Sequence, residues 1–249
     1  MRSVCLTIET SCRAGGVALA LDGALTAVRQ FDASSRHATT LLVRLRELLT
    51  AHGLVPANVT EVYVSVGPGS FTGVRVGVTV ARTLAQAMPG VKTVAVPTTH
   101  AVAENARALP WQHLAVVLDA KDEFAYVQSF QRETPHDAAP PQPAGPPRIL
   151  TPQQMLAEFP RPVTLIGEGL AYHHALREAA SATDGSAGEP TQRIILADPA
   201  LHLPTAESVY HVGQRLAHAN AGTDYHNLLP IYARKSEAER LWEEKQRQA

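Results

Sequence analysis

The chain has 249 residues and a mass of 26.7 kDa; 45% of its residues are hydrophobic and 18% are charged. A chain of this length buries a sizeable core, in one large domain or two smaller lobes, and needs neither disulfides nor a structural metal to fold. The formal net charge is -1, which argues against a protein that holds nucleic acid on its own basic face, because phosphate neutralisation requires clustered Lys and Arg. If the protein acts on RNA, we expect another subunit to hold that RNA.

The two cysteines and the N-terminal sequence indicate the compartment. Cys5 and Cys12 are seven residues apart and lack the C-x-x-C spacing of a metal or redox site, so we expect a reducing cytosol, with Cys12 a small packed thiol. Glu9 interrupts the run in which the apolar part of a secretory signal would continue. Because no apolar run approaches the roughly 20 residues of a membrane helix, we expect a soluble, cytoplasmic protein without membrane contact.

The first part of the chain predicts three strands followed by alternating helices and strands. Asp22-Gly23 is typical of a tight hairpin turn between the second and third strands. Leucines at helical spacing predict an amphipathic helix that ends at Gly53. In chain order, we expect strands at 4–8, 16–21 and 24–31, a helix at 37–52, a strand at 59–66, a helix at 73–88, a strand at 92–96 and a short helix at 98–107.

The same order of elements restarts in the second part. We expect strands at 114–118, 124–130 and 149–150, a helix at 152–158, a strand at 163–166 and a helix at 172–180. Two passes of β-β-β-α-β-α predict an α/β fold with two similar lobes and a cleft between them, as in actin, Hsp70 and sugar kinases, by analogy at the level of fold. We assign 1–107, with a helix at about 205–220, to a first lobe, 108–204 to a second lobe and 221–249 to a C-terminal tail.

Three stretches are expected outside the two cores. Residues 132–147 hold six of the 18 prolines and predict a solvated, partly extended insertion without a function of its own. A shorter loop is expected at 181–190, and the helix at 207–219 is expected to pack back on the first lobe. The segment 236–249 has helical propensity and a Glu243–Arg247 pair at i, i+4, but only two large apolar residues, so it is either frayed or ordered by a partner.

The most unusual segment, residues 65–77, reads SVGPGSFTGVRVG. Its glycines allow a sharp turn from a buried strand into a helix, whose free N–H groups could hold an anion. It is not a Walker A loop, since it has no Gly-Lys-Ser/Thr. The residues favour a tight turn capped by Ser70 or Thr72 over an anion site, and leave both open.

This block also carries a family resemblance. With IETSC at the end of the first strand and LDAKDEFAYVQ after Val117, the block GPGSFTGVRVG resembles the TsaB (YeaZ) family, and further likeness lies at the helix from residue 37, at 167–169 and at 230–234. The resemblance implies an actin-like (ASKHA, ribonuclease H-like) fold. It implies a role in attaching threonylcarbamoyl to N6 of adenosine 37 in tRNAs that read ANN codons. The partners implied are a TsaD-like transferase, a TsaE-like ATPase, and tRNA through the complex alone.

The resemblance further implies that this chain is a non-catalytic paralogue of the transferase. The transferase holds a metal through two histidines in an H-x-x-x-H pattern, and Thr98 and Val102 stand at those positions here. His100 and Glu104 also lie four residues apart, and we interpret them as a local pair on a solvated face rather than as metal ligands. We therefore expect neither a metal nor catalytic residues.

Nucleotide binding and hydrolysis remain alternatives. Thr10 and Ser11 follow the first strand, and Asp119 ends the matching strand of the second lobe, where actin-like enzymes contact phosphate and magnesium. We expect weak or vestigial nucleotide contact and no cofactor. The alternative function is a weak ATPase or a metallopeptidase-like (glycoprotease-type) hydrolase, although no G-x-S-x-G elbow supports a hydrolase triad.

The helix at 73–88 is the predicted contact with a partner. Gly73, Gly77 and Ala81 form a strip of small residues that lets another helix approach closely, although spacing alone favours packing on the helix's own sheet. The resemblance favours pairing with the transferase, or with a second copy when the transferase is absent. The predicted motif and interface residues are Gly67, Gly69, Ser70, Phe71, Thr72, Gly73, Arg75, Gly77 and Ala81.

Overall fold

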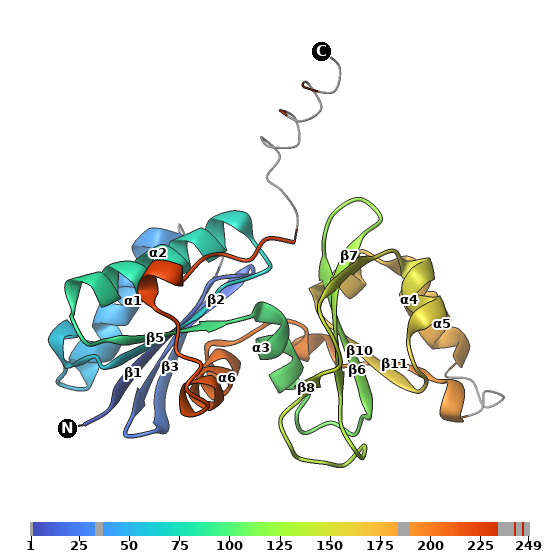
Figure 1. Ribbon diagram of the computed structural model, residues 1–249, viewed down its shortest axis with the longest axis horizontal. Helices are drawn as coiled ribbons and strands as arrows, with labels where there is room; N and C mark the ends of the chain where they lie inside the picture. Colours follow the sequence, from blue (N-terminus) through green and yellow to red (C-terminus); the bar gives the residue numbers. More distant parts are fainter. Residues whose placement is uncertain (1, 33–36, 184–189, 234–241, 243–245, 247–249) are drawn as a thin grey trace.

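The computed structural model describes residues 2–32, 37–183, 190–233, 242 and 246. Two mixed β-sheets lie side by side, each with helices packed on it, and α3 (Thr98–Asn105) lies between them (Figure 1). We call the part built on the N-terminal sheet the first lobe and the part built on the other sheet the second lobe. The predicted α/β fold with two similar lobes is confirmed.

The first sheet has the strand order β3-β2-β1-β4-β5. The strand β2 pairs antiparallel with both β1 and β3, whereas β1, β4 and β5 run parallel to one another. Every residue of β1 is buried, as expected for a central strand that is covered on both faces. The elements are β1 (Val4–Glu9), β2 (Ala14–Leu21), β3 (Ala24–Asp32), α1 (His37–Ala51), β4 (Glu61–Ser65), α2 (Phe71–Ala87) and β5 (Lys92–Val96).

The second sheet has the order β11-β10-β6-β7-β8, and β9 also pairs with β7. Its elements are β6 (His113–Asp119), β7 (Ala125–Gln131), β8 (Gln142–Pro143), β9 (Arg148–Leu150), α4 (Pro152–Glu158), β10 (Val163–Ile166), α5 (His174–Thr183) and β11 (Ile194–Leu196). In both sheets the first strand of the repeat therefore lies in the middle, between the second and the fourth. The short strands β8 and β11 were not predicted.

Short 3₁₀ helices connect or follow these elements: η1 (Pro56–Asn58), η2 (Glu168–Ala171), η3 (Pro190–Gln192), η4 (Pro199–Leu201) and η5 (Tyr225–Asn227).

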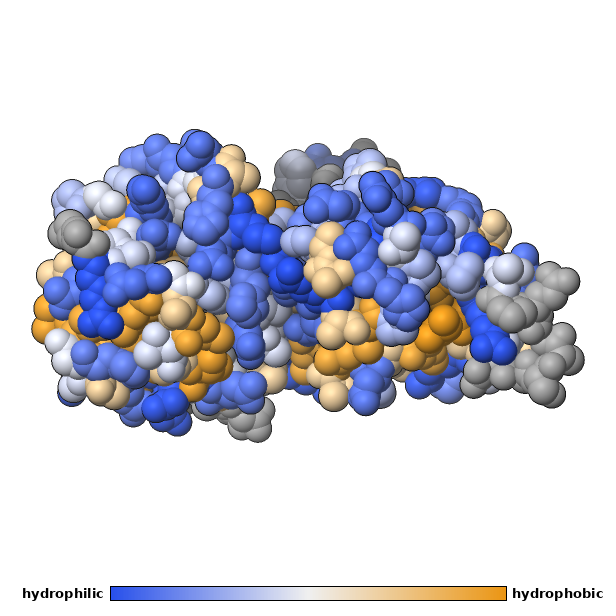
Figure 2. Space-filling model, turned by 90° about the horizontal axis from the view of Figure 1, so that it is seen from below, coloured by the Kyte–Doolittle hydropathy of each residue, from blue (hydrophilic) through white to orange (hydrophobic). Residues whose placement is uncertain are grey.

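Seen from below, the surface is largely hydrophilic, with hydrophobic areas on both lobes (Figure 2). No helix among the described residues is both long and apolar enough to cross a membrane.

Helices cover both faces of the first sheet. The leucines of α1 and the valines of α2 form one apolar core with one side of the sheet, and each large side chain buried there contributes about 1.5–3 kcal/mol. The helix α6 (Ala206–His218) packs on the other side, as expected, and its buried Val209, Tyr210 and Val212 form a second core with β1, β4 and β5. The C-terminal helix is therefore part of the first lobe.

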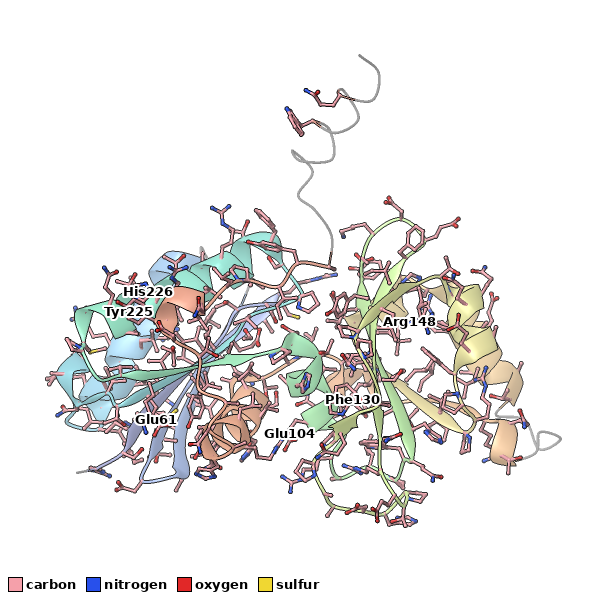
Figure 3. All side chains as sticks on the ribbon, viewed as in Figure 1. Glu61, Glu104, Phe130, Arg148, Tyr225 and His226 are labelled. Atoms are coloured by element: carbon pink, nitrogen blue, oxygen red, sulfur yellow. The ribbon has the colours of Figure 1, made fainter. Side chains whose placement is uncertain are left out.

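The helix α3 is more buried than the sequence suggests. Glu104 has only 5% of its side chain exposed, and Arg215 of α6 donates to both of its carboxylate oxygens, at 3.0 and 2.5 Å. The ring of His100 packs edge-on against Phe130 of β7, with centroids 5.3 Å apart. Figure 3 labels Glu104 on α3 and Phe130 on the second lobe. The interpretation of His100 and Glu104 as a pair on a solvated face is therefore wrong: Glu104 ties α3 to α6, and His100 contacts the second lobe.

The proline-rich insertion is exposed but anchored. The indole of Trp111 lies 3.9 Å from the guanidinium of Arg132, and the backbone N–H of Trp111 donates to the Pro135 carbonyl at 2.9 Å. The side chain of Arg107 donates to the Ala138 carbonyl at 3.0 Å. The insertion also contributes β8 to the sheet. The expected extended loop is thus held at Pro135 and Ala138 by the segment that follows α3, and at β8 by β7 of the second sheet.

Residues 221–233 run back across the first lobe, and we call this segment the strap. It begins with an isolated bridge between Thr223 and Thr93 of β5. Leu228 is fully buried in the core beneath α2, and the N–H of Ile231 donates to the Val66 carbonyl at 2.6 Å. The first part of the expected C-terminal tail is thus integrated into the lobe. The proposed Glu243–Arg247 pair lies outside the described residues.

Candidate functional site

The glycine block is packed against the turn that follows β1. A β-carbon at Gly69 would lie 2.2 Å from the Ser11 carbonyl oxygen, and one at Gly73 would lie 2.0 Å from the Thr10 carbonyl oxygen. The N–H of Ser70 donates to the Ser11 carbonyl at 2.6 Å. Only glycine permits this close approach of two backbone segments. The glycines therefore allow the loop to pack against the turn after the first strand.

The loop leads directly into α2. The Ser70 hydroxyl accepts a hydrogen bond from the Gly73 N–H at 3.2 Å, which caps the helix, whereas Thr72 lies exposed in the first turn. Of the two interpretations of this segment, the tight capped turn is the one found. A β-carbon at Gly67, where φ is +99°, would lie 2.3 Å from the Ile231 carbonyl, so the strap also depends on this block.

The strip of small residues on α2 faces inward. Gly73, Gly77 and Ala81 are all buried, and a β-carbon at Gly77 would lie 2.3 Å from the Thr10 hydroxyl oxygen. The helix uses this strip to approach its own sheet, the alternative that spacing alone favoured. The expectation that Gly73, Gly77 and Ala81 contact a partner helix is therefore wrong.

A different side of the helix is open to solvent. Six residues of α2 line a shallow groove of about 340 Å³: Phe71, Thr72, Arg75, Val76, Thr79 and Val80. The ring of Phe71, 42% exposed, packs against Tyr232 of the strap at 4.8 Å, and the Arg75 guanidinium lies 5.2 Å from its centroid. On the adjacent helix, Leu42 and Val43 are 55% and 49% exposed. We call these eight residues the α1–α2 face.

A cavity of about 340 Å³ lies between the lobes. Ser11, Arg13 and Ser70 line it from the first lobe, and Asp119, Lys121, Glu168 and Tyr172 line it from the second. The Arg13 guanidinium donates to the Tyr172 hydroxyl at 2.6 Å, and Lys121 pairs with Asp119 at 2.8 Å. The sequence-predicted Ser11 and Asp119 are thus brought to one cavity, although Glu168 and Tyr172 were not identified as cavity residues. The motif Gly167-Glu168-Gly169 was the available signal.

The hydroxyls expected to contact nucleotide are engaged within the protein. The fully buried Thr10 hydroxyl donates to the Gly73 carbonyl at 2.8 Å, and the Ser11 hydroxyl, also buried, donates to Glu9 at 2.6 Å. These two side chains therefore do not point toward a ligand in the cavity, which corrects that expectation. Asp119 does line the cavity, where it forms an ion pair with Lys121.

Burial controls the acids and thiols near this cavity. Desolvation raises the pKa of Glu9, which is fully buried and whose second carboxylate oxygen has no hydrogen-bond partner among the described residues. Burial and then the neighbouring Asp119 raise the pKa of Glu168. Burial, followed by the charge of Glu9, raises the pKa of the Cys12 thiol well above its ordinary value, so this cysteine is the packed, unreactive thiol that was expected.

The two positions at which the family resemblance leads one to expect metal-binding histidines carry other side chains here. Thr98 is fully buried at the start of α3, and Val102 is fully buried in the apolar core near Trp111 and Phe130. A methyl-bearing hydroxyl and an isopropyl group provide no imidazole nitrogen. Within residues 2–32, 37–183 and 190–233, no group of three or more His, Cys, Asp or Glu side chains is placed to hold a metal ion.

Comparison with known proteins identifies the family. A family model described as TsaD: tRNA N6-adenosine threonylcarbamoyltransferase matches residues 31–242. The chain is 28% identical over 244 residues to the tRNA threonylcarbamoyladenosine biosynthesis protein TsaB of Bacillus subtilis (strain 168), which covers 97% of this chain and 99% of that protein. It is 31% identical over 133 residues to the protein of the same name from Escherichia coli (strain K12), covering 51% of this chain and 55% of that one.

Solved structures show the same fold. YeaZ from Pseudomonas aeruginosa aligns with a TM-score of 0.72 at 24% identity and covers 92% of this chain and 99% of its own. A second Pseudomonas aeruginosa structure, of a protein with similarity to peptidase YEAZ, gives 0.73 at 24% identity, covering 93% and 100%. The order of strands in both sheets and these two structures confirm the actin-like, two-lobed fold. The family model spans most of the chain, and the chain therefore belongs to the family that this model describes, as a member of its TsaB (YeaZ) group.

Proposed function

We propose that this chain is a subunit of the assembly that attaches threonylcarbamoyl to N6 of adenosine 37 in tRNAs that read ANN codons. The observation that carries the proposal is the similarity to a TsaB protein along 97% of the chain. The proposed role is that of a non-catalytic partner, which forms a heterodimer with a TsaD-like transferase and holds it in a competent state. Because the substrate is tRNA, the proposed site of action is the cytoplasm.

The α1–α2 face is the proposed contact with the transferase. Leu42, Val43 and Phe71 expose between 42% and 55% of their area on two neighbouring helices of one lobe. Large apolar side chains exposed on neighbouring helices favour an interaction site, and an interface centre is enriched in aromatic residues and arginine. Arg75 and Arg82, both on the open side of α2, favour a partner with acidic residues at the edge of the contact.

Thr98 and Val102 support an accessory role. Their side chains are fully buried at positions where the resemblance places metal-binding histidines in the transferase. In the proposed complex the partner supplies the chemistry, a TsaE-like ATPase joins the pair, and tRNA is held through the assembly. When the transferase is absent, the same face is proposed to pair with a second copy of this chain.

The proposal is tested by reconstitution with purified components. The cognate transferase, the TsaE-like ATPase and tRNA are combined with and without this chain, and modified adenosine is measured by mass spectrometry of the digested RNA. We expect modification only when this chain is present. Undiminished product in its absence would contradict the proposal. ATP or peptide hydrolysis by the isolated chain would instead favour the alternative of an enzyme in its own right.

A further inference from the structure

A second cavity, of about 440 Å³, opens on the side of the first sheet covered by α6. Its floor is formed by Cys5, Ala20 and Val94, and its walls by Tyr63 and Tyr210, which are 3% and 2% exposed. The two rings stack with their centroids 6.2 Å apart. The α1–α2 face lies on the opposite side of the sheet, so an occupant here would not compete with the proposed partner.

A carboxylate in this cavity forms no ion pair with any described residue. Glu61, at the start of β4, accepts hydrogen bonds from the Tyr63 hydroxyl and, at 3.4 Å, from the Ser3 hydroxyl (Figure 3). Removing a carboxylate from bulk water costs free energy, which hydrogen bonds from neutral hydroxyls offset only in part. The cavity therefore offers a negative site that a ligand's positive group would complete.

A cation stands beside it at the cavity edge. Lys92, at the start of β5, is the register partner of Glu61, and neighbouring strands lie about 4.8 Å apart. Its ammonium group also belongs to no ion pair among the described residues, although both side chains line the cavity. The cavity thus presents a carboxylate and an ammonium group on adjacent strands, with an apolar floor between the stacked rings and the helix.

From this arrangement we propose that the cavity binds a free α-amino acid with an apolar side chain. The ligand ammonium group lies at Glu61, its carboxylate at Lys92, and its side chain on Cys5, Ala20 and Val94. An α-amino acid carries an ammonium and a carboxylate group on its α-carbon, so one small ligand can address both Glu61 and Lys92, which occupy paired positions on adjacent strands. The aromatic wall favours the ammonium end as well, since a cation is attracted to the face of a tyrosine ring.

The polar residues at the rim of the cavity would position a ligand and would not react with it. The Tyr210 hydroxyl donates to the Gly23 carbonyl at 2.6 Å and accepts from the Gln214 amide at 2.9 Å, so this side of the cavity is held in one arrangement. Burial raises the pKa of the Cys5 thiol far above its ordinary value, so the floor provides packing and no nucleophile. The site is therefore a reversible binding site.

The test uses the full chain and L-leucine as the probe, with binding measured by isothermal titration calorimetry and saturation-transfer NMR. We expect binding that weakens at least about tenfold in Glu61→Gln, because the glutamine keeps the shape of the side chain and loses the charge. N-acetyl-L-leucine, which lacks the ammonium group, should bind the unaltered protein equally weakly. Lys92→Met should weaken L-leucine several-fold and leave L-leucinamide unchanged.

Matched controls keep the result interpretable. Glu47→Gln removes a carboxylate from the exposed surface of α1 and should leave L-leucine binding unchanged. The comparison of L-leucine with its N-acetyl form on the unaltered protein does not depend on the folding of any variant. The proposal is overturned if L-leucine, L-phenylalanine and L-methionine all fail to bind at concentrations up to about 10 mM, or if Glu61→Gln binds as tightly as the unaltered chain.

Discussion

The two lobes share one strand order, yet their helices present different surfaces to solvent. In the second lobe the exposed positions of α4 and α5 include Gln153, Gln154, His174 and Glu178, which water solvates well. In the first lobe the corresponding helices expose the apolar α1–α2 face. Since both helix pairs bury an equivalent inner side against a sheet, folding alone does not require this difference. The contrast favours the first lobe's helices as the proposed partner contact.

The ends of the first strands make a second contrast between the lobes. In each lobe, a glycine that follows the fourth strand of the repeat packs on the first strand or on the turn after it: Gly69 on Ser11 in one, and Gly167 and Gly169 on Val117 and Leu118 in the other. In each lobe, a carboxylate at this strand end accepts a hydrogen bond from the backbone N–H two residues later. Glu9 accepts from Ser11, and Asp119 accepts from Lys121. The first-lobe carboxylate is sealed in, whereas that of the second lobe lines the cavity and pairs with a lysine.

The largest expected effect comes from filling the closest of these approaches. A β-carbon at Gly69 would lie 2.2 Å from the Ser11 carbonyl oxygen, whereas one at Gly169 would lie 2.8 Å from the Leu118 carbonyl carbon. We expect Gly69→Ala to lower the free energy of unfolding by about 3 kcal/mol, and Gly169→Ala by less. Gly222→Ala, whose β-carbon would meet its nearest atom at 3.9 Å, is the control. Equal urea denaturation midpoints for the three variants would show that the close approaches are not constraints.

Breaking the link between α3 and α6 should have the next largest effect. Arg215→Met leaves Glu104, 5% exposed, with only Arg107 at 3.3 Å. We expect a loss of about 2 kcal/mol, since one partner of a largely buried pair is removed. Arg148→Met, which breaks an exposed pair with Glu158, should cost less than about 1 kcal/mol. A larger loss in Arg148→Met than in Arg215→Met, measured by thermal unfolding, would contradict this assignment.

Glu9→Gln should change how stability depends on pH. Burial raises the pKa of Glu9 above its ordinary value of 4.5, so above that pH the folded state keeps a proton that the unfolded state has lost. The stability contributed by this group is fully present below pH 4.5 and is lost as the pH rises through the raised pKa. Glutamine resembles the protonated acid and does not titrate. We expect the stability of Glu9→Gln relative to the unaltered protein to increase between about pH 4 and about pH 8, and a constant difference would refute the shift.

The smallest effect is expected at the equivalent place in the second lobe. The side chain of Lys121 is 68% exposed, so water screens the lysine end of its pair with Asp119, whose own side chain is 10% exposed. We expect Lys121→Met to change the free energy of unfolding by less than about 1 kcal/mol, because exposed ion pairs contribute little. Measurement at low and high salt provides the check. A loss as large as that in Arg215→Met would mean that this pair closes the cavity.

Hydrophobic periodicity predicted most of this fold, because most of its helices and strands are long enough to show a repeating pattern of apolar residues. It did not predict β8 or β11, since two or three residues carry no period, nor the strap, whose residues 221–233 have no regular apolar period. For the candidate site, the glycine block was found by its composition. Spacing alone favoured packing of Gly73, Gly77 and Ala81 on the sheet, as found, whereas the family resemblance pointed to a partner helix. The Glu104–Arg215 pair joins residues 111 positions apart, a separation that local patterns do not reveal.

The central claim, that the α1–α2 face binds the transferase, is tested most directly by measuring that complex. The affinity of this chain for the cognate TsaD-like protein is determined by isothermal titration calorimetry for the unaltered chain, Leu42→Glu, Thr79→Glu and the second-lobe control Gln153→Glu. We expect a one-to-one complex that the first-lobe variants weaken by at least about tenfold and the control leaves unchanged. Unchanged affinity in both first-lobe variants, or no complex with the unaltered chain, would contradict the account.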